Sequence, residues 1–161
     1  MNKMMLIVVL LAFCTLAFAQ AGMFGIEAGA GADKVDRALK QQGFQVKESS
    51  DSKTVYNHPK KANLKSLDVI KDSSTGAVVE WLVLFDISKE DTSGAAILAE
   101  IKKLHGDTDV EDDFDADYIW YFSDDRALYV TVDEGDTILL DYASGNYDDD
   151  YDWYCYDDWY W

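Results

Sequence analysis

The sequence has 161 residues and a formal net charge of −17, from 31 Asp and Glu residues against 14 Lys and Arg. Such a charge repels the phosphates of nucleic acids and anionic lipids, so it excludes nucleic-acid binding and favours cations or basic protein surfaces as partners. The length suits one domain that buries its own core.

Residues 1–19 have the pattern of a secretory signal peptide. A lone Lys3 precedes an apolar run, and small residues at Ala17 and Ala19 mark a cleavage site before Gln20. The alternative is a membrane anchor, but the apolar run is shorter than the roughly 18 to 20 residues that span a bilayer. We therefore expect a secreted or periplasmic protein with no membrane span after cleavage. A single α+β domain is expected at 20–145, followed by an acidic-aromatic tail at 146–161.

The mature chain predicts a helix followed by strands, twice over. In chain order we expect a strand at 23–27, a helix capped by Asp33 and stopped at Gly43, strands at 44–47, 54–57, 67–71 and 77–87, a helix ending at His105 before Gly106, and strands at 118–123, 126–133 and 136–142. The segment 77–87 is apolar on both sides, which is typical of a central strand. In the second helix, Ile97, Leu98, Ile101 and Leu104 recur at helical spacing.

Tight turns between successive strands predict a mainly antiparallel sheet of about six to eight strands. Both helices are expected on one face of this sheet, and the repeated order suggests two helix-plus-meander halves. The element order and the FGIEAG…KV…L opening around the first helix resemble small exported bacterial domains of the outer-membrane-assembly lipoprotein and β-lactamase-inhibitor-protein kind. The resemblance implies a domain that binds other proteins without catalysis.

Motifs for catalysis are weak in this sequence. Of the two histidines, His58 lies in a His-Pro turn and His105 at a helix end, where a capping or solvated role is common. The histidine and cysteine spacing does not match a zinc site, and no phosphate loop or serine nucleophile elbow is present. Because carboxylates abound, a carboxylate-dependent hydrolase is kept as an alternative, although the class of enzyme is the less favoured one.

The acidic segment 107–117 contains candidate calcium ligands. Carboxylates alternate along it, and we take Asp107, Asp109, Glu111 and Asp113 as the candidates because calcium binds closely spaced oxygens. The segment departs from the helix-loop-helix calcium pattern, since its sixth position is Asp112 rather than glycine. A calcium-binding exported protein is therefore one alternative, and a solvated acidic loop is the other.

The chain ends in YDDDYDWYCYDDWYW, at 147–161, a run of eight aromatics, six aspartates and one cysteine. Repulsion among the aspartates favours a disordered terminus, whereas the aromatic rings favour contact with the domain or a partner. Tyrosine and tryptophan are enriched in binding hot spots. The candidate interaction residues are Tyr154, Cys155, Tyr156, Trp159, Tyr160 and Trp161.

Cys155 is the only cysteine of the mature chain, because Cys14 leaves with the signal peptide. It is either an incidental thiol or the site of an intermolecular disulfide, which would link two copies or one copy and a partner.

The excess negative charge is concentrated in the C-terminal part of the chain: residues 105–161 hold nineteen acids and one base, whereas residues 20–104 hold twelve of each. We therefore expect a non-catalytic domain that uses its acidic C-terminal half and aromatic tail to bind a basic or aromatic-binding protein.

Overall fold

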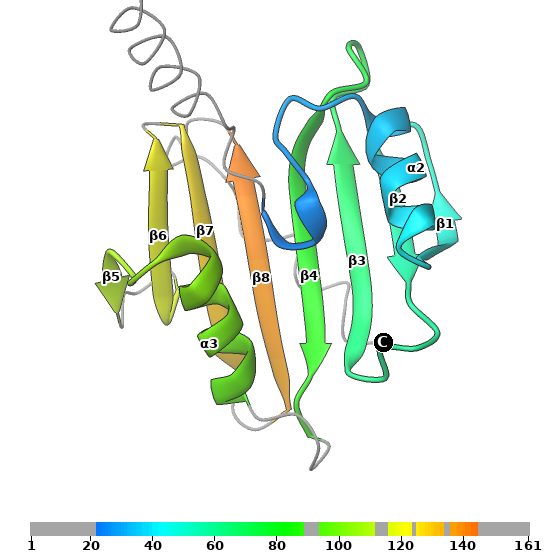
Figure 1. Cartoon of the computed structure of the whole chain (residues 1–161). Helices are drawn as coiled ribbons and strands as arrows, with labels where there is room; N and C mark the ends of the chain where they lie inside the picture. Colours follow the sequence, from blue (N-terminus) through cyan, green and yellow to red (C-terminus); the bar gives the residue numbers. More distant parts are fainter. Residues whose placement is uncertain (1–21, 89–93, 112–115, 124, 134–135, 145–161) are drawn as a thin grey trace, which may run out of the picture.

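The computed structural model describes residues 22–88, 94–111, 116–123, 125–133 and 136–144. Within these residues it contains two α-helices, a short 3₁₀ helix and an eight-stranded antiparallel sheet, which confirms the predicted α+β class (Figure 1). The elements are η1 (Met23–Gly25), α2 (Ala32–Gln41), β1 (Gln45–Ser49), β2 (Lys53–Asn57), β3 (Leu64–Lys71), β4 (Val78–Asp86), α3 (Gly94–His105), β5 (Val110–Glu111), β6 (Tyr118–Ser123), β7 (Arg126–Asp133) and β8 (Thr137–Ser144). Neither described α-helix is long and apolar enough to cross a membrane.

The sheet consists of two halves that meet at β4 and β8. The strand order is β1-β2-β3-β4-β8-β7-β6-β5, so each half is one helix followed by four strands in sequence order. The last strands of the two halves pair antiparallel, with Val83 opposite Leu140 and both side chains fully buried. An approximate twofold axis perpendicular to the sheet therefore passes through this seam.

Rotation about such an axis exchanges the two halves but leaves each face of the sheet on its own side, so helices related by it lie on the same face. In Figure 1, α2 and α3 are both drawn in front of the sheet, α2 near β1–β3 and α3 near β6–β8. Their buried side chains belong to one continuous core, to which α2 contributes Val35 and Leu39 and α3 contributes Ile97 and Ile101. The strands supply alternate residues to this core, because side chains along a strand point to opposite faces in turn.

The first predicted strand is wrong. Residues Met23–Gly25 form a 3₁₀ helix in which Phe24 has a left-handed φ of 67°. The first long helix begins at Ala32, with Gly31 at its N-cap, so Asp33 lies in the first turn and does not cap it. Both helices stop where expected, because Gly43 and Gly106 follow them with positive φ values that other residues rarely adopt.

The segment predicted as a central strand is central. Strand β4 lies between β3 and β8, and its Trp81, Val83 and Phe85 are buried in the core. The apolar stripe predicted for the second helix is wrong at its last position, because Leu104 is 49% exposed. Strand β5 was not anticipated, since its two residues lie inside a segment that reads as an acidic loop.

Candidate functional site

Three places in the described chain gather polar or aromatic groups. They are a pocket between α2 and strands β1–β3, the face of the sheet that α2 and α3 do not cover, and a histidine-tyrosine cluster at the seam.

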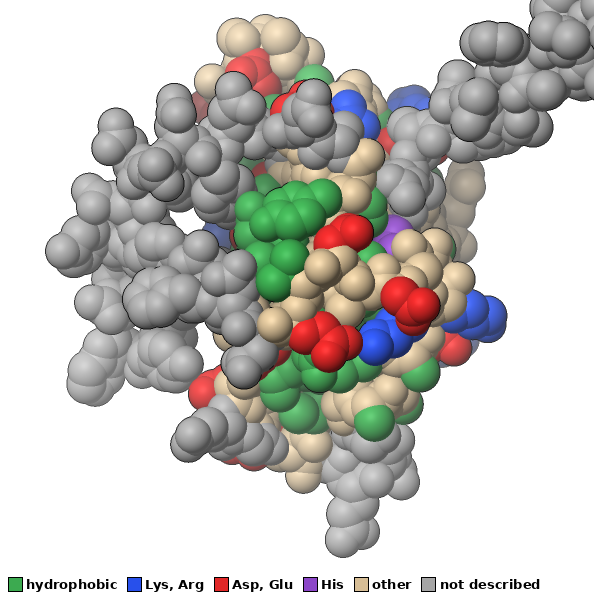
Figure 2. All heavy atoms as spheres, turned by 90° about the vertical axis from the view of Figure 1, so that its left-hand side faces the viewer, with side chains coloured by type: hydrophobic (Ala, Val, Ile, Leu, Met, Phe, Trp, Pro, Cys, Tyr) green, Lys and Arg blue, Asp and Glu red, His purple; other side chains and the backbone are tan. Residues whose placement is uncertain are grey.

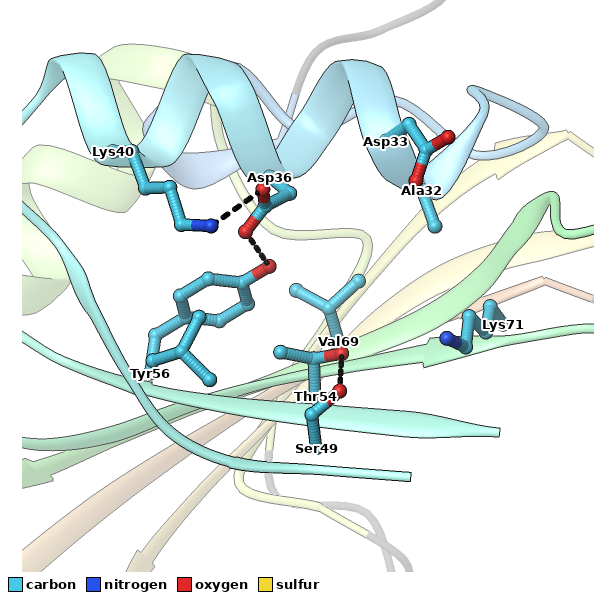
Figure 3. Close-up of a pocket in the computed structure, with 10 residues that line it drawn as sticks. Ala32, Asp33, Asp36, Lys40, Ser49, Thr54, Tyr56, Val69 and Lys71 are labelled. Carbon is cyan, nitrogen blue, oxygen red and sulfur yellow. Dashed lines mark hydrogen bonds and ion pairs between the residues drawn. The ribbon is translucent and has the colours of Figure 1, made fainter. Parts of the chain in front are cut away.

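The pocket has a volume of about 400 Å³ and opens between α2 and the β1–β2 hairpin (Figure 3). Its polar centre is Asp36 on α2, which accepts a hydrogen bond from Tyr56 Oη at 3.0 Å and pairs with Lys40 Nζ at 2.8 Å. Burial and the neighbouring carboxylate raise the pKa of Tyr56, so its hydroxyl remains a donor at neutral pH. The arrangement anchors α2 to β2, and the Asp36 carboxylate is already bound by two partners.

The second place is the helix-free face, which consists of the side chains that alternate with the core positions along each strand. In-register pairing aligns one row across it from β2 to β6: Val55, Asp68, Leu82, Asp141, Tyr129 and Ile119. A neighbouring row brings Leu84 of β4 next to Leu139 of β8. Apolar side chains therefore run along the seam on the face opposite to the helices.

A small buried apolar cluster lies at the β5–β6 edge of this face. Ile119 and Ala127 are buried there, with Val110 and Tyr129 packed against them. Tyr121 on β6 is 54% exposed. Figure 2 views the molecule from the β5 and β6 side and shows hydrophobic side chains at the surface beside Asp and Glu side chains.

Acidic groups lie among these apolar side chains. Asp68 is 1% exposed, and Lys53 Nζ lies 3.2 Å from its Oδ2 as an ion pair. Glu80 is opposite Ala143 and next but one along β4 from Leu82, and its burial raises the pKa of its carboxyl group. Asp141 is also buried. Lys53 gives Asp68 an opposite charge, which offsets the hydration that a buried carboxylate loses.

The third place is centred on Tyr142 of β8, on the helix-covered face. The Tyr142 ring stacks on Trp81 with centroids 4.8 Å apart and planes inclined by 12°. Its hydroxyl lies 2.9 Å from His105 Nε2 and accepts a hydrogen bond from the Met23 backbone N–H at 3.2 Å. The expected solvated or capping role of His105 is therefore wrong. The side chain is half-buried against Phe122 and Tyr142, and this burial lowers its pKa.

His58 has a different environment. Its Nε2 lies 3.0 Å from the Gln42 carbonyl oxygen at the end of α2, and its ring packs edge-on against Phe44 at 5.0 Å. Its Nδ1 accepts a hydrogen bond from the Lys60 backbone N–H at 3.2 Å. These contacts fix the loop after β2 against the end of α2.

The candidate calcium ligands that the structure describes each have a separate environment. Asp109 Oδ2 accepts a hydrogen bond from the Tyr121 backbone N–H at 2.7 Å, and Glu111 pairs with Lys102 at 3.5 Å. Asp107 is exposed, and Asp113 lies outside the described residues. In the part of the chain that the structure describes, no three His, Cys, Asp or Glu side chains form a group that could hold a metal ion. Calcium binding stays a prediction.

The candidate interaction residues of the tail all lie outside the described residues: Tyr154, Cys155, Tyr156, Trp159, Tyr160 and Trp161. The apolar residues of the helix-free face were not among the predicted site residues. A signal for them was present, because Leu82 and Leu84 make the second side of β4 apolar.

No protein-family model matches this chain, and no curated protein or solved structure matches it significantly.

Proposed function

We propose that this protein is an exported, non-catalytic binding domain for a basic protein partner. Its interaction surface consists of the helix-free face at the acidic C-terminal half, together with the aromatic tail. The observation that carries the proposal is the apolar seam of Leu82, Leu84 and Leu139 on a face that α2 and α3 leave uncovered. These three leucines are half-buried, and apolar surface rimmed by polar groups is characteristic of protein-binding surfaces.

The type of surface favours a macromolecular partner over a small molecule. The helix-free face extends across strands from β2 to β6, whereas the pocket beside α2 has its charged centre bound by Tyr56 and Lys40. A sheet face of this extent matches the area of a protein interface better than it matches a closed small-molecule site.

Charge selects the kind of protein partner. Asp141 and Glu80 lie beside the apolar seam, and the residues from 105 onward carry the whole acidic excess. A partner with Lys or Arg side chains around an apolar or aromatic centre would complement this surface, and the complementarity would speed association at low salt. Nucleic acid is excluded by the same charge.

The experiment starts by crosslinking the mature protein in envelope and culture fractions of its source and purifying the partner so identified. Affinity for the purified partner is then measured by calorimetry for the wild type, for a chain ending at residue 146, and for Leu84→Asp. The matched control is Leu104→Asp, which changes an exposed leucine on α3. We expect Leu84→Asp and the truncation each to weaken binding about tenfold or more, equivalent to about 1.4 kcal/mol, with little effect of Leu104→Asp.

Equal affinities for the wild type, the truncated chain and Leu84→Asp would refute the proposed surface. Binding that strengthens with added salt would refute the basic character of the partner, because screening weakens attraction between opposite charges. Circular dichroism of each variant checks that the fold is retained.

A further inference from the structure

The pocket between α2 and the β1–β2 hairpin is shaped by a β-bulge in β1. Val46 and Ser49 each pair with a residue of β2, and the register shifts between them, which leaves Lys47 as an extra residue. In a regular strand, side chains three residues apart point to opposite faces. Because of the bulge, Val46 and Ser49 both line the pocket. Bulges that redirect a side chain in this way are over-represented beside active sites.

Several polar groups of the pocket are bound to one another. Asp36 accepts a hydrogen bond from Tyr56 and pairs with Lys40, and the hydroxyl groups of Ser49 and Thr54 lie 3.2 Å apart as a hydrogen bond (Figure 3). These contacts join α2 to β2 and β1 to β2. They hold the walls of the cavity in place and leave its remaining charges for a ligand.

Two charged side chains of the lining have no such contact. Asp33 lies in the first turn of α2, and Lys71 is the last residue of β3. Neither side chain makes a hydrogen bond or an ion pair within the part of the chain that the structure describes. Figure 3 shows both toward the end of the pocket where α2 begins, Asp33 on the helix and Lys71 on the sheet. The pocket therefore offers one carboxylate and one ammonium group beside the apolar side chains of Val46 and Val69.

This pair of charges selects the chemistry of a ligand. An anion would meet the Asp33 carboxylate and the net charge of −17, and a cation would meet the Lys71 ammonium group. A neutral molecule would displace water from both charges without replacing it. A zwitterion offers each charge an opposite one, and its own net charge of zero avoids repulsion by the acidic chain.

We propose that this pocket binds a small zwitterion of the amino-acid or dipeptide class. The ammonium group of the ligand pairs with Asp33, its carboxylate pairs with Lys71, and its apolar part lies against Val46 and Val69. The volume of about 400 Å³ is within the range of small-molecule sites, about 300 to 1,000 Å³. The site lies beneath α2, on the face opposite to the helix-free face, so it adds a second binding function that does not depend on the proposed one.

Titration of the ¹⁵N-labelled mature protein with alanyl-alanine, followed by NMR, tests the proposal. We expect the amide signals of Asp33, Val69 and Lys71 to shift with a Kd of about 1 mM, while the signal of Leu104 on α3 stays in place. The N-acetylated dipeptide lacks the ammonium group, and the C-amidated dipeptide lacks the carboxylate. Each should bind about threefold or more weakly than the free dipeptide, as expected for loss of a partly exposed ion pair.

Two variants assign each charge of the ligand to its partner. Lys71→Met should bind the free dipeptide and its amide with equal affinity, and Asp33→Asn should bind the free and the acetylated dipeptide with equal affinity. The matched control is Lys65→Met, which changes an exposed lysine of β3 that does not line the pocket. This control should discriminate among the three dipeptides as the wild type does. The amide spectrum of each variant checks that the fold is retained.

Three results would overturn the inference. They are unshifted amide signals at about 10 mM dipeptide, tenfold above the expected Kd, equal affinities of the wild type for the free and the blocked dipeptides, and loss of discrimination in Lys65→Met. The proposed function is measured separately, by the affinity for the protein partner. If Lys71→Met loses its preference for the free dipeptide and keeps its affinity for the partner, both proposals stand. If the dipeptide does not bind but Leu84→Asp weakens partner binding, only this inference fails.

Discussion

Replacing Tyr142 with phenylalanine tests the polar centre of the seam. The substitution keeps the ring that stacks on Trp81 at 4.8 Å and removes only the hydroxyl group. Two groups lose their partner: the Met23 backbone N–H and His105 Nε2. The other ring nitrogen of His105, Nδ1, is buried and has no hydrogen-bond partner within the described chain, so no second contact compensates.

The expected cost follows from these contacts. Leaving a buried donor or acceptor without a partner costs about 1 to 3 kcal/mol, and both groups here are only partly buried. We therefore expect Tyr142→Phe to lower the free energy of unfolding by about 1 to 3 kcal/mol. For a chain of this size the melting temperature should fall by about 3 to 10 °C, because 1 kcal/mol corresponds to a few degrees.

Urea denaturation and calorimetry measure this change, and Tyr121→Phe is the matched control. Tyr121 is 54% exposed, so removal of its hydroxyl group should change stability by less than about 0.5 kcal/mol. Equal stabilities of the Tyr142→Phe and Tyr121→Phe variants would refute the assigned role of the hydroxyl group.

The same cluster predicts a pH dependence. Burial lowers the pKa of His105, so the unfolded chain takes up a proton at a higher pH than the folded chain does. The stabilising contribution is fully present above the ordinary histidine pKa of about 6.5, and it is lost as pH falls from there through the folded-state value. His105→Gln should reduce this loss of stability. An identical pH profile for the variant and the wild type would contradict the assignment.

Three further predictions concern other parts of the chain. Burial raises the pKa of the Glu80 carboxyl group, so its stabilising contribution is present at low pH and is lost as pH rises through the folded-state pKa. The Glu80→Gln variant should therefore have a higher melting temperature than the wild type at pH 7. In acid the difference between the two melting temperatures should vanish. Gly22→Ala should destabilise the fold by about 1 to 3 kcal/mol through contact with Trp81. Gly31→Ala, with no atom within 4 Å of its added Cβ, should cost less, because it loses only the N-cap preference for glycine over alanine; equal melting temperatures would contradict this. Calcium at about 1 mM should raise the melting temperature if the segment 107–117 binds it, and an unchanged value would exclude that alternative.

Local patterns in the sequence correctly predicted the first and last residues of some elements. Strands β6 and β7 have the predicted limits, because segments rich in aromatic and β-branched residues lie between turn residues there. The short segment 23–27 has no such alternation, and its contacts with Phe44 and Tyr142 override a weak strand preference. The pairing of β4 with β8 joins residues far apart in the sequence, and local patterns carry no information about that register.

The candidate site was predicted less completely, for a related reason. Apolar residues at Leu82 and Leu84 were visible, but their position on an uncovered face depends on which face both helices pack against. His105 lies next to Gly106, a position typical of a solvated cap, and only the return of β8 brings Tyr142 against it. The predicted residues of the tail lie outside the described residues, so their role stays a prediction.

The approximate twofold relation between the halves has a consequence for recognition. A symmetric pair of halves would present two equivalent surfaces, and a partner could bind in either of two orientations. The charges break this equivalence, since residues 20–104 carry twelve acids and twelve bases whereas 105–161 carry nineteen acids and one base. The extra acids include Asp141, which lies on the helix-free face directly opposite Leu82 at the seam. The proposed basic partner should therefore bind off-centre, toward β6–β8, so that charge rather than shape would give the two-half scaffold one preferred orientation.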